Sequence, residues 1–156
     1  MSNDNAVTVF TAKSIETILR DGGSSSWRVD PNRVREYTYL VCTRNAKLDW
    51  VEGPEPHRFG FFIGKISGVV PTPGDSSGRS LIQVDAYARI AVPNAWLGDR
   101  NPVRYMSLSD IGIDPATITW EAMPNSTPQL TFNEARVQLA RTYGVRPGAV
   151  EITIRG

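Results

Sequence analysis

The sequence predicts an α+β fold: a small curved antiparallel β-barrel or sheet flanked by short helices, with a C-terminal helix–strand unit. Residues 59–70 and 80–90 alternate in side-chain character as strands do, and helical patterns occur near both ends of the chain. A chain of 156 residues is long enough to bury its own core. We therefore expect a single domain over residues 1–156, with the barrel core in residues 37–121 and the C-terminal unit in residues 131–156.

The N-terminal part predicts two strands with two short helices between them. A strand at residues 7–10 precedes a helix at residues 13–20, whose apolar side chains recur at helical spacing and which a pair of glycines ends. Asp30 before Pro31 is typical of a helix start and predicts one or two turns. Residues 37–44 alternate β-forming side chains and predict the first strand of the barrel.

The segment FGFFIGKISGVV, residues 59–70, carries most of the fold prediction. Glycine alternates with a large apolar residue along its even positions, which form one face of a strand. Such a face fits the inside of a small curved barrel. In residues 80–90 apolar side chains alternate with polar ones, which indicates an antiparallel strand with one face in water.

The C-terminal half predicts shorter elements. Residues 103–106 and 118–121 are expected to be short strands, and residues 107–110 fit a capping box for one helical turn between them. A second capping box begins an amphipathic helix over residues 131–143, and a turn then leads to a last strand at residues 150–154.

Composition limits the class of protein. The net charge is +1, and so small a positive charge argues against a uniformly basic nucleic-acid-binding protein. No apolar run is long enough to span a bilayer, so we expect no membrane partner. The first ten residues lack the basic start and apolar core of a signal peptide, and Cys42 is the only cysteine, so the cytoplasm is the expected location.

Few residues are suited to catalysis. The chain has neither a Walker-type phosphate loop nor a glycine-rich dinucleotide fingerprint. His57 is the only histidine, so a nucleophile pair that includes histidine would have to use it, and a site with several histidine ligands is excluded. We assign no catalytic residue, no metal ligand and no cofactor. A small metal-independent enzyme that uses His57 or a carboxylate stays open as an alternative.

Polar and aromatic residues gather at three places that are suited to a ligand pocket. Residues 22–27, GGSSSW, form a flexible glycine hinge followed by three serines and a tryptophan. Residues 44–45 end the first predicted barrel strand. Residues 96–105, WLGDRNPVRY, combine stacking and hydrogen-bonding side chains around Pro102, which favours a bulge or a strand edge. The candidate ligand-binding residues are Ser25, Trp27, Arg44, Asn45, Trp96, Arg100, Asn101, Arg104 and Tyr105. The alternative is that they are turn and packing residues.

Three segments, YTYLVCTRN, FIGKISGVV and AYARIAVPNAWLGDRNPVRY, resemble the PUA-like superfamily, which includes EVE, YTH and ASCH domains. The similarity covers residues 37–105. Those families are small curved barrels flanked by helices, and many bind nucleic acid, often with a modified base inside an aromatic cage. The chain as a whole is also similar to uncharacterised conserved bacterial proteins.

The resemblance implies aromatic walls, polar contacts to a base, and phosphate contacts. The aromatic walls would be Trp27, Trp96 and Tyr105. The polar contacts to a base would come from Ser25, Arg44 and Asn45, and the phosphate contacts from Arg100 and Arg104.

Three functions follow as hypotheses. We favour a non-enzymatic module that binds nucleic acid, with a modified or flipped base in a pocket that has aromatic walls and an arginine rim. The second is the small enzyme described above. The third is a protein-interaction or regulatory subunit that pairs an exposed strand with a partner.

Overall fold

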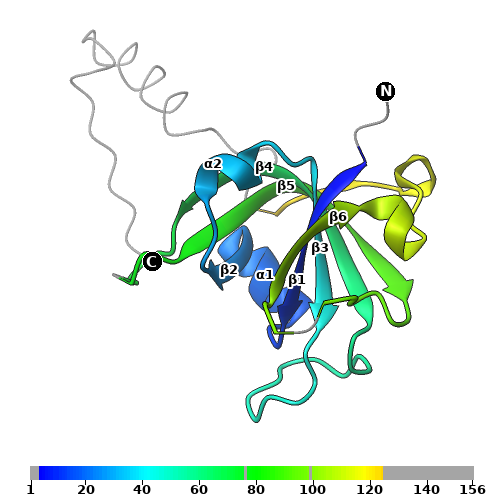
Figure 1. Ribbon diagram of the computed structural model, residues 1–156, viewed down its shortest axis with the longest axis horizontal. Helices are drawn as coiled ribbons and strands as arrows, with labels where there is room; N and C mark the ends of the chain where they lie inside the picture. The colour runs from blue at the N-terminus through cyan, green and yellow to red at the C-terminus, as the bar shows by residue number, and fades with distance from the viewer. Residues whose placement is uncertain (1–3, 76, 99, 125–156) are drawn as a thin grey trace, which may run out of the picture. The chain divides into compact units, whose positions relative to one another are not determined.

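The computed structural model describes residues 4–75, 77–98 and 100–124 (Figure 1). The strands are β1 (Asn5–Thr11), β2 (Gly23–Trp27), β3 (Tyr39–Arg44), β4 (Gly60–Pro71), β5 (Ser80–Val92), β6 (Val103–Ser107) and β7 (Glu121–Ala122). The helices are α1 (Ile15–Asp21), α2 (Pro31–Arg35) and two 3₁₀ turns, η1 (Leu108–Ile111) and η2 (Pro115–Thr117).

These strands form one mixed sheet in the order β2-β5-β4-β3-β1-β6, and β7 also pairs with β5. β1 and β3 run parallel because α1, β2 and α2 connect them, and a parallel pair needs such a crossover. The sequence predicts an antiparallel barrel or sheet. The sheet is confirmed, but within the described residues it is mixed and not closed into a barrel, since β2 and β6 lie at its two ends.

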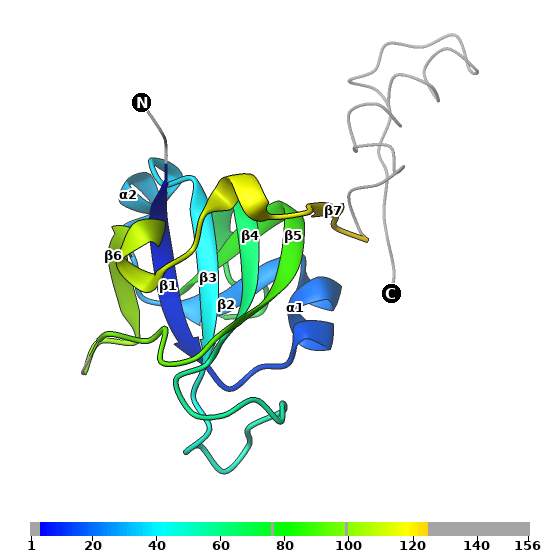
Figure 2. The same cartoon turned by 90° about the vertical axis from the view of Figure 1, so that its right-hand side faces the viewer.

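Both faces of the sheet are covered. Figure 2 shows β2 crossing behind β3, while residues 108–120 lie in front of the strands. The inner core, on the side of α1 and α2, contains Val7, Val9, Ile18, Val34, Leu40, Cys42, Phe62, Val84 and Val103. The outer core, under η1, contains Ala6, Val41, Ile63, Ala88, Leu108, Ile111 and Ile113. Alternate residues of one strand therefore belong to opposite cores, as the side-chain period of two requires.

The glycine-alternating segment is a strand, as predicted. A Cβ atom on Gly64 would lie 2.6 Å from Cγ1 of Val84 on the neighbouring strand β5. Glycine at this position therefore allows Val84 to pack across the bare backbone of β4. Register shifts between Lys65 and Gly68 interrupt the alternation further along the strand and are the kind of irregularity that bends a strand.

The N-terminal helices lie close to their predicted positions. Ser14 caps α1 by accepting a hydrogen bond from the Thr17 amide, and Gly22 ends the helix with a φ of 78°. Asp30 caps α2 in the same way, with Pro31 at the first helical position.

The C-terminal predictions have a mixed outcome. Residues 107–110 form the predicted capping box at η1. Strand β7 has only two residues, 121 and 122, in place of the predicted 118–121. The predicted helix at 131–143 and strand at 150–154 lie outside the described residues. None of the helices in the described part of the chain is long and apolar enough to cross a membrane.

Candidate functional site

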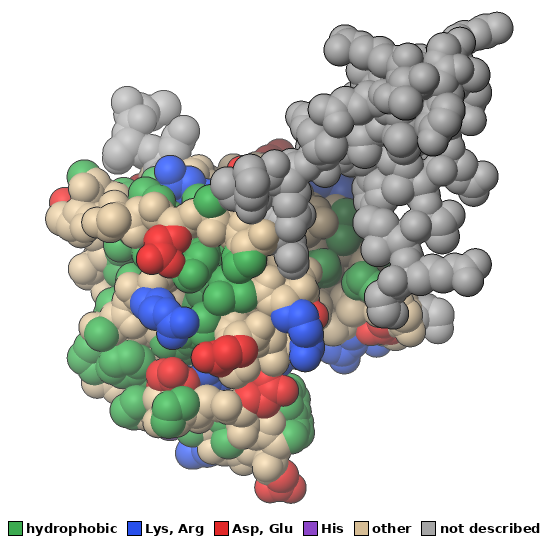
Figure 3. Space-filling model, turned by 180° about the vertical axis from the view of Figure 1, so that it is seen from behind, with side chains coloured by type: hydrophobic (Ala, Val, Ile, Leu, Met, Phe, Trp, Pro, Cys, Tyr) green, Lys and Arg blue, Asp and Glu red, His purple; other side chains and the backbone are tan. Residues whose placement is uncertain are grey.

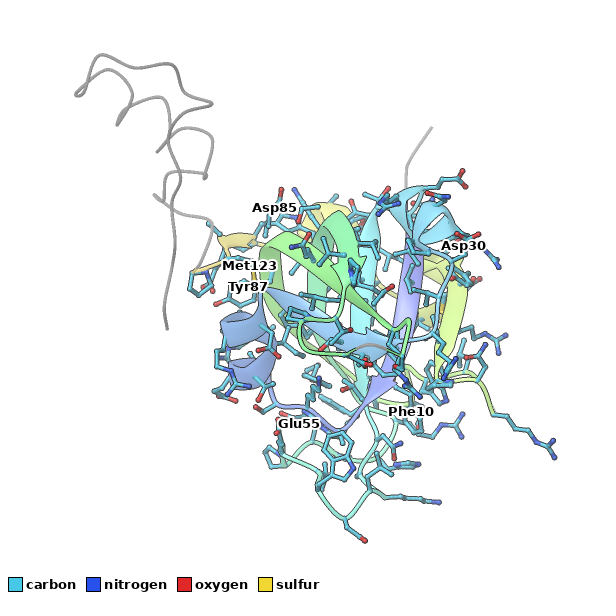
Figure 4. All side chains as sticks on the ribbon, turned by 90° about the vertical axis from the view of Figure 1, so that its left-hand side faces the viewer. Phe10, Asp30, Glu55, Asp85, Tyr87 and Met123 are labelled. Carbon is cyan, nitrogen blue, oxygen red and sulfur yellow. The ribbon has the colours of Figure 1, made fainter. Side chains whose placement is uncertain are left out.

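A hollow of about 340 Å³ lies where the end of β1, the strand β2 and the loop after β3 come together. Phe10, Trp27 and Trp50 supply aromatic walls, and we call this hollow the tryptophan pocket. Figure 4 shows Phe10 at the end of β1, on the side of the molecule where the loop with Glu55 projects. Of the described residues, three large apolar side chains are strongly exposed, and Leu48 and Trp50 of the pocket are two of them.

Two of the aromatic walls are fixed by packing. The Trp27 ring is buried, and its Nε1 donates a hydrogen bond to Oγ of Ser24 at 3.0 Å. The Phe10 ring stacks on Trp96 with centroids 4.9 Å apart and an interplanar angle of 2°. Trp96 is 2% exposed, so it supports the Phe10 wall from behind and does not face the hollow itself. Trp50 is 55% exposed and forms the open side.

A bulge in β2 brings serine side chains and two cations to the pocket. Ser24 pairs with Ile82 and Trp27 with Ser80, so Ser25 and Ser26 oppose a single residue of β5. Bulges of this kind redirect side chains. The Lys13 ammonium donates to Oγ of Ser25 at 2.9 Å, and the Arg79 guanidinium donates to the Ser26 carbonyl at 3.2 Å. Both cations line the pocket, together with Asn45, and none of the described residues that line it is an aspartate or a glutamate.

Arg44 does not line the tryptophan pocket but supports the backbone that does. Its side chain has no exposed surface, and its guanidinium lies 4.1 Å above the Phe61 ring. Nη1 donates to the carbonyl oxygens of Thr11 and Lys13 at 3.1 and 2.7 Å, and Nη2 lies 2.8 Å from the Glu55 carboxylate. The arginine therefore fixes the backbone of residues 11–13 and does not lie at an open rim.

The loop after β3, residues 45–59, is tied to α1 as well. The Glu52 carboxylate accepts hydrogen bonds from the Ser14 amide at 2.9 Å and the Thr17 hydroxyl at 2.8 Å. These two hydrogen bonds lower the pKa of Glu52. The Glu52 amide donates to the Ala12 carbonyl at 2.8 Å. Leu48 and Trp50 thus lie in a loop anchored on both sides.

His57 belongs to this loop and is engaged in its structure. Its Nδ1 accepts a hydrogen bond from the Ala46 amide at 3.1 Å, and its ring packs edge-on against Phe10. Desolvation lowers the pKa of His57, and the positive charges of Lys47 and Arg58 lower it further, so the imidazole is neutral near pH 7. This geometry uses Nδ1 as an acceptor within the loop.

The structure offers few other reactive groups. Cys42 is buried in the inner core, and burial raises the pKa of its thiol to about 12, so it stays protonated. Within residues 4–75, 77–98 and 100–124, no group of three or more His, Cys, Asp or Glu side chains is placed to hold a metal ion.

A second hollow of about 410 Å³ is lined by Arg28, Arg33, Asn101 and Tyr105, and we call it the arginine pocket. The Arg33 guanidinium lies 3.7 Å above the Tyr105 ring, which in turn packs against Tyr37 with centroids 5.0 Å apart. Desolvation raises the pKa of the Tyr105 hydroxyl. The Asn101 side chain accepts a hydrogen bond from the Val103 amide at 3.1 Å and so closes a turn.

The nine residues predicted from the sequence divide into three groups. Ser25, Trp27 and Asn45 meet in the tryptophan pocket. Asn101 and Tyr105 line the arginine pocket. The structure places Arg44, Trp96, Arg100 and Arg104 in neither.

The predicted site residues of segment 96–105 do not line one pocket, because β6 begins within the segment and its side chains alternate between two faces. Arg104 lies on the strand face opposite to Val103 and Tyr105 and donates to the Leu97 carbonyl at 3.0 Å. Arg100 is exposed.

Sequence reasoning missed Phe10, Lys13, Trp50 and Arg79. Trp50 lies in an irregular loop, where no periodicity indicates a direction for a side chain. A tryptophan in a segment without a strand or helix pattern was nevertheless a usable signal, because such a residue has no core face to occupy.

Comparison of the chain with protein-family models, with curated proteins and with solved structures finds no match.

Proposed function

We propose that the protein is a non-enzymatic nucleic-acid-binding module and that the tryptophan pocket accommodates one base, either single-stranded or flipped from a duplex. One observation carries the proposal: Phe10, Trp27 and Trp50 line a hollow whose described lining residues also include two cations and no carboxylate. Aromatic side chains bind bases by stacking, and cations next to them attract the phosphate backbone.

The polar residues of the pocket suit the edges of a base. Ser25 and Asn45 offer a hydroxyl and an amide group that can donate or accept hydrogen bonds, while the Ser26 hydroxyl already donates to the Asp75 carboxylate at 2.9 Å. Recognition of unstacked bases commonly combines such polar contacts with an aromatic surface. The volume of about 340 Å³ is at the small end of the range for small-molecule sites. A hollow of this size can hold one base, natural or modified.

The basic character is local. The net charge of the chain is +1, and Figure 3 shows a face on which acidic and basic side chains are interspersed. Lys13 and Arg79 therefore define one place for a polyanion to bind and not a general attraction over the surface.

Trp50→Ala tests the proposal. Removal of one stacking surface costs about 1–3 kcal/mol, so the dissociation constant for a labelled single-stranded oligonucleotide should rise about 5- to 150-fold. Fluorescence anisotropy at low salt measures it. The exposed Trp50 side chain supports no core, so the variant should keep its circular-dichroism spectrum and thermal midpoint.

Leu97→Ala is the matched control, since Leu97 is 45% exposed and lines neither pocket. It should bind as the wild type does. The proposal is withdrawn if the wild-type protein binds neither DNA nor RNA pools at low salt. It is also withdrawn if both variants bind equally well.

A further inference from the structure

The tryptophan and arginine pockets are lined by residues that are adjacent in the chain. In each of the residue pairs 27–28, 78–79 and 101–102, one residue lines the tryptophan pocket and its chain neighbour lines the arginine pocket. Consecutive Cα atoms are about 3.8 Å apart. The two hollows therefore adjoin each other at three separate places along the chain.

Positive charge exceeds negative charge among the described residues that line the arginine pocket. Arg28 and Arg33 are both exposed, and neither makes an ion pair among the residues that the structure describes. Among the described residues that line the hollow, the one carboxylate is that of Asp30, which accepts a hydrogen bond from the Asn32 amide at 3.0 Å as the cap of α2. Two guanidinium groups thus stand beside one carboxylate that already has a backbone partner.

One of these guanidinium groups is held in place. The Arg33 guanidinium carbon lies 3.7 Å from the centre of the Tyr105 ring, and Tyr105 is supported by Tyr37. A guanidinium stacked on a ring still presents its N–H groups at its edge. Arginine donors match the oxygens of a phosphate in pairs, so a positioned arginine beside a second one is suited to a phosphate group.

We propose that the arginine pocket binds the phosphodiester group that adjoins the base held in the tryptophan pocket, through Arg28 and Arg33. This inference rests on the proposed function and makes it more specific. The ligand is a strand with a phosphate at a fixed position relative to the bound base, and a free base or nucleoside fills only the first hollow.

Substitution of single phosphates tests this on the wild-type protein. A short single-stranded DNA with one preferred base is prepared as a series in which each linkage in turn is an uncharged methylphosphonate. We expect one linkage, next to the preferred base, to raise the dissociation constant about tenfold when neutralised, the size of one charge-assisted hydrogen bond. The other linkages should have a smaller effect.

The variant Arg28→Gln/Arg33→Gln identifies the residues. It should weaken binding of the unmodified strand and make the plot of log affinity against log salt shallower by about 0.7, the slope that one phosphate of a single strand contributes. In this variant, neutralising the critical linkage should have no further effect. Arg20→Gln/Arg89→Gln removes the same charge from two exposed arginines outside both hollows and should keep the dependence on that linkage.

The outcomes separate the two proposals. Absence of oligonucleotide binding by the wild type overturns both. If Trp50→Ala weakens binding while every methylphosphonate has the same effect, the phosphate assignment alone is overturned. The same conclusion follows if the Arg28/Arg33 variant matches its Arg20/Arg89 control.

Discussion

The buried guanidinium of Arg44 connects segments that are distant in the sequence. It binds the backbone of residues 11–13 at the end of β1 and the Glu55 carboxylate in the loop after β3. Gly53 lies against it, since a Cβ atom there would be 2.5 Å from Nη2 of Arg44 and would collide with Oε1 of Glu55. One residue thus aligns two walls of the tryptophan pocket.

Arg44→Met should be strongly destabilising. It leaves the Lys13 carbonyl and a half-buried Glu55 carboxylate without their donor, and breaking a buried ion pair of this kind costs about 3–5 kcal/mol. Urea unfolding measures the decrease in stability. The double variant Arg44→Met/Glu55→Met no longer has the unpaired carboxylate, so it should be more stable than Arg44→Met alone. Equal stability of the single and double variants would show that the ion pair is not what Arg44 contributes.

At the level of single residues, the sequence predicts some of the residues that meet in one hollow and misses others. Ser25, Trp27 and Asn45 are predicted site residues that meet in one hollow. The burial of Arg44 could not be predicted, because it depends on Glu55 folding back over it from the following loop. Trp96 is an aromatic residue in a polar segment, and only the tertiary packing on Phe10 shows that it faces inward.

At the level of elements, strand β4 shows how glycine admits a neighbouring side chain. Gly64→Ala would place a Cβ atom 2.6 Å from Cγ1 and 2.9 Å from Cβ of Val84, in the inner core, where a stiff β-branched residue cannot give way. Overpacking of this kind costs about 1–3 kcal/mol. Chemical denaturation should show a decrease of that size in the free energy of unfolding.

Gly68→Ala on the same strand is the control. Its Cβ atom would approach only Oε1 of Gln83, the end of a flexible and half-buried side chain that can rotate away. We expect a stability close to that of the wild type. Equal decreases at both positions would mean that glycine acts in β4 through backbone conformation and not through the packing of Val84.

The elements themselves are largely predictable, with one informative exception. β1, α1, α2 and β3 to β6 follow from periodicity, caps and β-forming residues. The sequence of β2, GSSSW, predicts a hinge because it has low strand propensity, and this prediction is wrong. The segment is a strand because β5 supplies a hydrogen-bonding edge, and Gly23 allows close approach: a Cβ atom there would collide with the Ile82 carbonyl.

At the scale of the whole described unit, stability should differ between the centre and the ends of the sheet. β3 pairs with strands on both sides, and its side chains belong to the inner and the outer core alternately. β7 pairs through two exposed residues only. Native-state hydrogen exchange should therefore find the slowest amides in β3 and its neighbours, opening only with global unfolding, and fast exchange at β7. Uniform protection across these strands would contradict this picture.

The mixed topology of the sheet could not be predicted from the sequence. A strand pattern shows which face of a segment is apolar, but not which segment lies beside it. The parallel pairing of β1 with β3 depends on the whole connection through α1, β2 and α2 folding back across one face.

The anchoring of the loop that carries Trp50 has a consequence for recognition. Glu52 and Glu55 hold this loop on α1 and on Arg44 in the folded protein itself. The entropy of ordering that wall is thus given up once, when the chain folds, and does not recur with each binding event. A ligand therefore binds to a preformed site, and the entropy lost on binding is chiefly that of the ligand.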